Sequence, residues 1–123
     1  MRYIMLVYEA PADLDRRDDP AGDPYIAAWR AYHKALVEAD VFVVGAPLKQ
    51  AATATTVRLR EGRRQVQDGP FAEAKEELGG FFILELPSMD AALDWAARCP
   101  AAAAGALEIR PMDLDMYETV VRP

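Results

Sequence analysis

The amino-acid sequence predicts an α+β fold in which an antiparallel sheet carries two helices on one of its faces. Two helix-forming stretches, 24–39 and 88–99, each follow an apolar strand and precede another strand. A polar hairpin over 53–67 separates these two halves. The order strand-helix-strand, hairpin, strand-helix-strand is that of the split β-α-β, ferredoxin-like layout.

The first half begins with an apolar strand over residues 3–8. Residues 10–24 are rich in Pro and Asp, and this composition predicts a flexible acidic loop. Asp23 followed by Pro24 is a strong helix start, because Asp caps free N–H groups and Pro fits the first helical position. The helix should end near 39–40, and its inward stripe is expected to hold Ile26, Trp29, His33, Leu36 and Val37.

A second apolar strand is expected over 41–46, followed by the hairpin. Residues 53–60 alternate apolar and polar side chains, which predicts a half-buried strand. Glu61-Gly62 turns this strand back into a short partner over 63–67. The strand predicted over 81–86 then returns to the main sheet, and it is apolar on nearly both faces.

The second half closes with a helix and a strand. Ser88 is the expected cap of a helix that runs to about Cys99, where Pro100 stops it. The last strand should cover 106–112, and a C-terminal tail follows over 113–123. No linker or internal repeat divides the chain, so residues 1–123 are expected to form one domain.

Composition narrows the classes of function. The chain has 123 residues, of which 52% are hydrophobic, and a formal net charge of −6. Such a charge argues against binding nucleic acid. Cys99 is the single cysteine, so a cysteine-based zinc site is excluded and a reducing, cytoplasmic location is expected. The N-terminal apolar run is too short for a signal peptide or a membrane span.

The strand patterns predict a homodimer. A sheet with helices on one face and water on the other should alternate apolar and polar residues. Residues 3–8, 41–44 and 81–86 do not alternate. The chain offers no third layer, so a second copy packed sheet against sheet is the simplest cover for the other face.

Residues 68–80 form the most distinctive segment, reading Asp-Gly-Pro-Phe-Ala-Glu-Ala-Lys-Glu-Glu-Leu-Gly-Gly. Asp-Gly-Pro is turn chemistry, and Gly79-Gly80 closes the segment in a similar way. The carboxylates and the lysine between these breaks lie on a loop or on a single helical turn. Two interpretations stay open: a solvated charged connector, or a loop that carries chemistry.

This segment is similar to the signature of the DGPF branch of the YCII-related proteins. The matching residues are Asp68-Gly69-Pro70-Phe71-Ala72-Glu73, Lys75-Glu76 and Gly79-Gly80-Phe81. The resemblance covers roughly residues 2–112. It implies a ferredoxin-like monomer that pairs into a dimeric α/β barrel. Relatives with this fold include small isomerases, lyases and monooxygenases that often need neither metal nor organic cofactor, so no metal and no cofactor are expected.

The chain departs from the wider YCII pattern at two positions. Suspected YCII enzymes resemble one another in a His on the first helix and an Asp just after a Gly-Pro that follows the second strand. Here the position that matches the His is nearer Trp29 than His33, and Ala46-Pro47 is followed by Leu48. The resemblance therefore implies no His-Asp pair in this chain.

The candidate catalytic residues are His33, Asp68, Glu73 and Lys75. His33 is the only histidine, and its ordinary pKa near neutrality suits a general base, although a core histidine is the simpler interpretation. Asp68 caps the following turn or points into a cavity. Clustered carboxylates suit acid-base chemistry, with Lys75 as an anion stabiliser, while a salt network is the alternative.

The candidate ligand-binding residues are Phe71, Glu76, Arg58 and Arg110. An Arg inside a dimer barrel must be paired or must hold an anionic ligand. We therefore expect a protein that binds a small organic molecule, with cofactor-independent proton transfer (isomerisation, elimination or cyclisation) as its chemistry if it is an enzyme. The alternative is a non-catalytic binding or regulatory module, for example one associated with an alternative sigma factor, next to whose genes the DGPF branch is often encoded.

Overall fold

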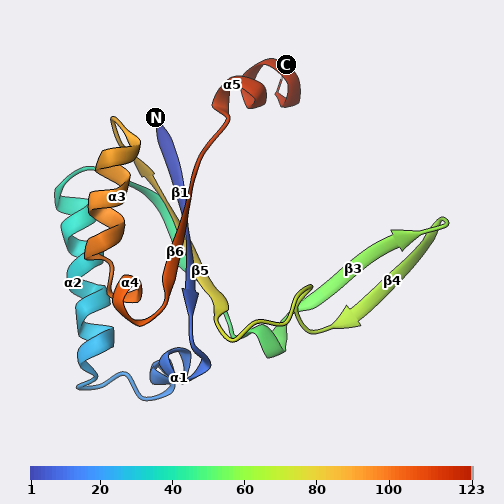
Figure 1. Cartoon of the computed structure of the whole chain (residues 1–123), viewed down its shortest axis with the longest axis horizontal. Coiled ribbons are helices and arrows are strands. Elements are labelled where there is room, and N and C mark those ends of the chain that lie inside the picture. The colour runs from blue at the N-terminus through green and yellow to red at the C-terminus, as the bar shows by residue number, and fades with distance from the viewer. Residues whose placement is uncertain (123) are drawn as a thin grey trace.

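A computed structural model describes residues 1–122 and shows a four-stranded antiparallel sheet with helices on one face (Figure 1). The strand order is β2-β5-β1-β6, with β1 and β5 in the centre. This arrangement confirms the predicted ferredoxin-like fold. The strands are β1 Arg2–Glu9, β2 Phe42–Pro47, β5 Glu77–Glu85 and β6 Ala106–Pro111, and the helices on the sheet are α2 Pro24–Glu38, α3 Met89–Arg98 and α4 Pro100–Ala104.

The core lies between the sheet and these helices. Along β1, Tyr3, Met5 and Val7 are buried while the residues between them are only half-buried, so this strand directs one alternating set toward the helices. Next to these buried residues, aromatic side chains of α2, α3 and β5 pack edge to face against one another. The Tyr32 hydroxyl donates to the Trp95 carbonyl oxygen at 2.7 Å, which satisfies its polar end and joins α2 to α3.

Helix α2 begins where the sequence predicts. The Asp23 carboxylate accepts from the Tyr25 and Ile26 N–H groups at 2.8 and 3.3 Å. The inward stripe, however, differs from the prediction, because His33 and Val37 are exposed. The helix is oriented so that its aromatic residues Tyr25, Trp29 and Tyr32 face the sheet together with Leu36.

Two segments predicted to be irregular contain helical turns. Helix α1 Pro11–Leu14 and the 3-10 turn Asp15–Asp18 (η1) replace much of the acidic loop. Pro11 starts this helix and Leu14 is buried, so one apolar anchor orders a segment that its Asp content marks as loop. The tail forms α5 Leu114–Met116 and a π-helical turn Tyr117–Val121. The last residue of the predicted tail, Pro123, lies outside the described residues.

The second face of the sheet has an apolar centre. We call it the open face, and it comprises Ile4 and Leu6 of β1, Phe81 and Ile83 of β5, and Val44 of β2. The register pairs Ile4 with Ile83 and Leu6 with Phe81, so these side chains lie side by side. In Figure 1 the helices α2, α3 and α4 all lie on the other face. These three helices therefore leave the open face uncovered.

The predicted hairpin exists but stands apart from the main sheet. Strands β3 Thr55–Arg60 and β4 Arg63–Asp68 form a separate two-stranded sheet that projects from the body (Figure 1). Glu61 and Gly62 both have positive φ, at 52° and 75°, as the turn between two strands requires. The prediction that β3 is half-buried is wrong within this chain, because Val57 and Leu59 are both exposed.

The segment after the hairpin is irregular until β5 begins at Glu77. The loop interpretation of residues 69–76 is therefore confirmed, and the single helical turn is wrong. Glu77 to Gly80 belong to β5, so the glycine pair of the motif lies inside a strand rather than in a closing turn. Within the part of the chain that the structure describes, no helix has the length and apolar character needed to cross a membrane.

Leucines on two helices provide a test of the core. Leu36 on α2 is 2% exposed, whereas Leu93 on α3 is 52% exposed. We expect Leu36→Ala to lower the free energy of unfolding by about 2 to 5 kcal/mol, because it leaves a cavity between helix and sheet. Leu93→Ala should lower the free energy of unfolding by less than about 1 kcal/mol, because this side chain is already exposed. Urea denaturation measures both, and equal losses would contradict this assignment of the core.

The thiol of Cys99 gives a second test. Cys99 is buried between α3 and α4, and burial raises the pKa of its thiol to about 12. The thiolate is the nucleophile, so the folded protein should resist iodoacetamide at pH 8, and urea-unfolded protein should react within minutes. Mass spectrometry of the alkylated protein measures this difference. Equal labelling rates in the two states would show that the thiol is accessible.

Candidate functional site

A pocket of about 380 Å³ opens between α2 and the sheet. One wall is formed by Ile26, Trp29 and Tyr32 of α2, and Val7 and Phe82 of the central strands form part of the other. The volume and the mainly apolar, aromatic lining are typical of pockets that bind small molecules. Polar side chains gather at the end of the pocket that lies near the N-terminus of α2, and they are Glu9, Asp13, Arg17 and Tyr25.

Glycines keep the sheet side of the pocket free of side chains. Gly45 of β2 and Gly79 and Gly80 of β5 all line it. A Cβ atom on Gly45 would come within 2.6 Å of the Phe82 Cβ, and one on Gly79 within 2.7 Å of Glu9 Oε1. A glycine at position 79 therefore leaves room for the Glu9 carboxylate at the polar end of the pocket.

Glu9 is the centre of the polar end. It is the last residue of β1, on the same face as Tyr3, Met5 and Val7, and it is 4% exposed. The Tyr25 hydroxyl donates to Glu9 Oε2 at 2.6 Å. Burial and this hydrogen bond to Glu9 raise the pKa of Tyr25, so the phenol stays protonated and acts as a donor.

Arg17 connects three parts of the chain at the same place. Its Nη2 donates to the Gly79 carbonyl oxygen at 2.8 Å, and its Nη1 donates to the Leu48 carbonyl oxygen. Nη2 also lies 3.7 Å from Glu9 Oε1. The guanidinium thus offsets the charge of the buried carboxylate and fixes η1 against the ends of β2 and β5.

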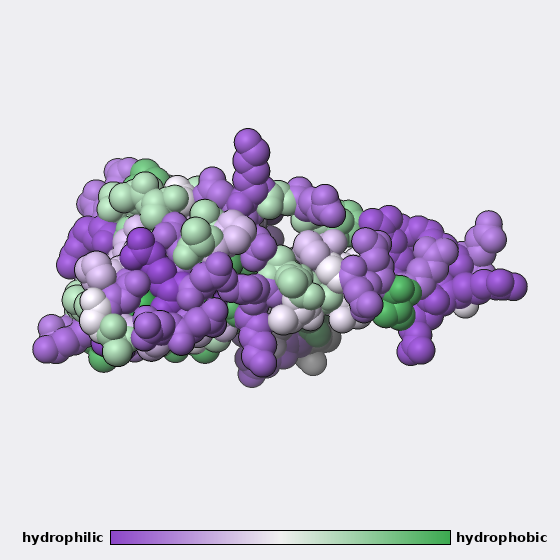
Figure 2. All heavy atoms as spheres, turned by 90° about the horizontal axis from the view of Figure 1, so that it is seen from below, coloured by the Kyte–Doolittle hydropathy of each residue, from purple (hydrophilic) through white to green (hydrophobic). Residues whose placement is uncertain are grey.

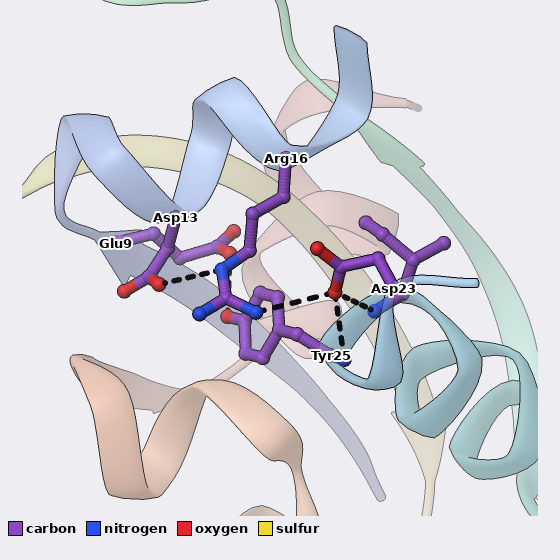
Figure 3. Close-up of polar contacts among 6 residues, drawn as sticks. Glu9, Asp13, Arg16, Asp23 and Tyr25 are labelled. Atoms are coloured by element: carbon purple, nitrogen blue, oxygen red, sulfur yellow. Dashed lines mark hydrogen bonds and ion pairs between the residues drawn. The ribbon is translucent and has the colours of Figure 1, made fainter. Parts of the chain in front are cut away.

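A second arginine organises the rim of this cluster (Figure 3). Arg16 Nε lies 3.2 Å from Asp13 Oδ1, and Arg16 Nη1 donates to Asp23 Oδ1 at 3.2 Å. The same guanidinium lies 5.3 Å from the centre of the Tyr25 ring. The arginine joins α1 and η1 to the capping residue of α2, so the segment 11–23 closes one end of the pocket.

Of the residues singled out from the sequence, His33 lines the pocket. It is exposed at the surface of α2. Its ring packs edge to face against the Phe42 ring, with 4.7 Å between the two ring centres. His33 thus lies at the edge of the pocket rather than in the core, and its role as a general base stays a prediction. The remaining candidates do not line this pocket, and they are Arg58, Asp68, Phe71, Glu73, Lys75, Glu76 and Arg110.

These other residues lie on the hairpin, on the loop after it, and on β6. The Arg58 guanidinium lies 4.8 Å from the centre of the exposed Phe71 ring. Arg110 forms an ion pair with Glu108 of the same strand, with 2.6 Å between Arg110 Nε and Glu108 Oε2. Their catalytic and ligand-binding roles stay predictions.

Glu9, Arg17 and Tyr25 were not selected from the sequence. One signal was present, because Glu9 continues the alternating positions of Tyr3, Met5 and Val7, which point toward the helices. A carboxylate in that register must be buried, and a buried carboxylate requires partners. Nothing local indicated that those partners would come from residues 17 and 25.

Comparison with known proteins agrees with this fold. The model of the YCII-related domain matches residues 1–113, and the chain belongs to this family. It is 40% identical over 116 residues to an uncharacterised protein of Rhizobium meliloti (strain 1021), covering 93% of this chain and 94% of that protein.

One solved structure has the same fold. It is 5-chloro-2-hydroxyhydroquinone dehydrochlorinase from Burkholderia phenoliruptrix AC1100, in complex with 2,5-dihydroxybenzoquinone. The TM-score is 0.52 at 22% identity, with 92% of this chain and 94% of that chain covered.

The two neighbouring arginines allow a matched test of the cluster. Arg17→Gln removes the partner of a buried carboxylate and two carbonyl hydrogen bonds, so we expect a loss of about 2 to 3 kcal/mol in the free energy of unfolding. Arg16→Gln removes ion pairs with Asp13 and Asp23 that are more exposed than the pair between Arg17 and Glu9. It should therefore lower the free energy of unfolding by less than about 1 kcal/mol.

The double-mutant cycle with Glu9→Gln isolates the pair between Arg17 and Glu9. If the two substitutions are additive in chemical denaturation, Arg17 does not stabilise the buried carboxylate and this interpretation of the cluster is wrong.

Proposed function

We propose that the pocket between α2 and the sheet binds a small, planar, largely apolar molecule that carries a hydrogen-bond donor. The observation that carries this proposal is the buried carboxylate of Glu9 at one end of an otherwise aromatic cavity. Asp13 adds a second carboxylate, and Arg17 is engaged by two carbonyl groups. This end therefore favours a neutral hydroxyl or amine donor over an anionic group.

The family pattern supports the same location. In suspected YCII enzymes, the resemblance places a His on the first helix and an Asp after the second strand. Of the matching positions in this chain, Trp29 lines the pocket, and the Leu48 carbonyl oxygen accepts from Arg17 at its polar end. The chain thus keeps a cavity beside these positions, and it brings a different carboxylate, Glu9, into it.

Cofactor-independent proton transfer is the chemistry that this arrangement favours. Glu9 would accept a proton from a carbon or hydroxyl of the ligand, and the same proton would return to another atom, as in an isomerisation. Tyr25 would orient the carboxylate through its hydrogen bond, and His33 would serve as a second titratable group at the far edge of the pocket. A second copy covering the open face would complete the homodimer that the strand patterns predict.

A non-catalytic ligand-binding module is the second candidate. One observation favours it: Glu9 is already engaged by Tyr25 and Arg17, so its carboxylate is held in place by protein groups. Asp68, Glu73 and Lys75 remain candidates for chemistry only if a partner brings a ligand to the exposed loop after the hairpin.

The binding proposal is tested with a neutral and an anionic probe of similar size. We expect hydroquinone to quench the fluorescence of Trp29 and to bind at least about tenfold more tightly than benzoate, because benzoate meets the carboxylates. Ile26→Trp, which fills the pocket, should abolish the binding of hydroquinone. Tighter binding of benzoate, or no binding of either probe, would refute the proposal.

Hydrogen exchange separates the two candidate functions. In D₂O, resorcinol exchanges ring hydrogens through a keto form, and the rate is followed by NMR. An enzyme of the proposed kind should accelerate this exchange, and Glu9→Gln should slow it by roughly 100-fold. Asp94→Asn, at an exposed position of α3 outside the pocket, serves as the control. Binding without any acceleration over buffer would favour the non-catalytic module.

A further inference from the structure

The hairpin of β3 and β4 carries an apolar face that stays exposed. We define the arm as residues 55–68, which project from the body as a mainly hydrophilic extension with a hydrophobic patch (Figure 2). The register places Val57 opposite Val66, and Leu59 follows two residues later on the same side of β3. These three side chains are between 59% and 67% exposed. A two-stranded hairpin is marginally stable in water at best, so this face needs a packing partner.

The C-terminal tail has the same property. We define the tail as residues 113–122, which include α5 and the π-helical turn, and none of its helical residues is buried. It stands clear of α2, α3 and α4 in Figure 1. Met116 and Val120 are four residues apart, as are Tyr117 and Val121, so these four apolar side chains share one side of the turns. A helix of this length is not stable alone in water, so the tail needs a packing partner as well.

The arm and the tail carry opposite local charges. The arm has four arginines and two carboxylates, whereas the tail has three carboxylates and one arginine. That arginine, Arg122, already pairs with Glu118 of the tail, which leaves Asp113 and Asp115 to give the tail its negative charge. Within residues 1–122, the arginines of the arm form no ion pair. One of them, Arg64, lies on the apolar face, opposite Leu59. The two elements are therefore complementary in charge as well as in polarity.

The arm and the tail leave the sheet at diagonally opposite corners. The arm joins the end of β2 to the start of β5, where Pro47 is opposite Gly80 and Gly80 is opposite Val7, near the end of β1. The tail follows β6, whose Pro111 is opposite Tyr3, near the start of β1. Since β2 and β6 are the two edge strands, the corners differ in both end and edge. Figure 1 shows the arm and the tail on the side of the sheet away from the three helices.

A second copy packed on the open face brings these two corners together. A two-fold axis that runs between the two sheets along the other diagonal exchanges the corners, so the arm of each copy faces the tail of the other. The strands of the two sheets then cross at a steep angle, which is one of the two common modes of sheet packing. The six-residue strands of the arm span about 20 Å, and packed sheets lie only about 10 Å apart. The arm is therefore long enough to reach the tail of the second copy at the corner of the sheet.

We propose that the arm and the tail form a reciprocal clasp at the rim of the homodimer. The face of Val57, Leu59 and Val66 in one copy packs on the apolar side of the tail in the second copy. Each chain gives one arm and one tail, so two identical contacts close the assembly at two copies. The clasp leaves the centre of the open face to the contact of sheet on sheet. It rests on the homodimer proposed above and is independent of ligand binding in the pocket.

The test combines substitutions on the two elements. Val57→Thr with Val66→Thr keeps β-branched residues in the arm but removes apolar contact. Met116→Gln with Val120→Thr does the same in the tail at nearly constant side-chain size. In sedimentation equilibrium, we expect each pair of substitutions to weaken dimerisation by roughly tenfold or more. All four together should weaken it little more than either pair alone, because both pairs disrupt the same contact.

A matched control lies on the polar face of the same hairpin. Gln65→Thr with Gln67→Thr should leave the affinity of the dimer unchanged, because these side chains point away from the apolar face. If the arm pair and the tail pair of substitutions act additively on dimerisation, the arm and the tail do not contact each other and the clasp is wrong.

A direct contact measurement accompanies this comparison. In dimers mixed from isotope-labelled and unlabelled chains, we expect intermolecular NOEs between the methyl groups of Val57 or Val66 and those of Met116 or Val120. Arm NOEs that arise only within one chain, or only to other parts of the second copy, would overturn the clasp and leave the homodimer standing. A wild-type protein that sediments as a monomer would overturn both, whereas hydroquinone binding reports on the pocket alone.

Discussion

A carboxylate buried between a sheet and its helices must be paired, and Glu9 imposes this constraint on the surrounding structure. Its two oxygens face partners from different elements, the Tyr25 hydroxyl of α2 and the Arg17 guanidinium of η1. Arg17 in turn donates to carbonyl oxygens at the ends of β2 and β5. The pairing of this one side chain therefore links β1 to four other segments, since an unpaired carboxylate at this depth would cost several kcal/mol.

The same constraint explains the shape of the pocket. Gly79 has no room for a side chain, because Glu9, Leu14 and Arg17 occupy the space that a Cβ would need. The polar cluster thus fills one end of the space between α2 and the sheet. The aromatic residues of α2 line the remaining space, together with Gly45 and Gly80 of the sheet. At both glycines a Cβ would clash with the neighbouring strand, so these positions require the absence of a side chain.

Most of the fold could be predicted from local signals. The caps at Asp23 and Ser88 depend on residues close in sequence, and the structure confirms both. The helical turns over 11–18 were missed, because a single buried leucine outweighs a loop-like composition. The site was mostly missed as well. Its residues 9, 17, 25 and 79 are joined only by tertiary contacts, whereas the conspicuous charged motif lies largely outside the pocket.

The place where the hairpin joins the sheet makes it a separable module. The Leu48 N–H donates to the Gly79 carbonyl oxygen at 2.8 Å, so the chain leaves the body and returns to it at two residues that already touch. Residues 49–76 between them, which include β3 and β4, form an excursion from the sheet, and its length has little effect on the closure entropy of the domain. Related chains can therefore lengthen, shorten or replace this excursion while the sheet, the helices and the buried carboxylate stay as they are.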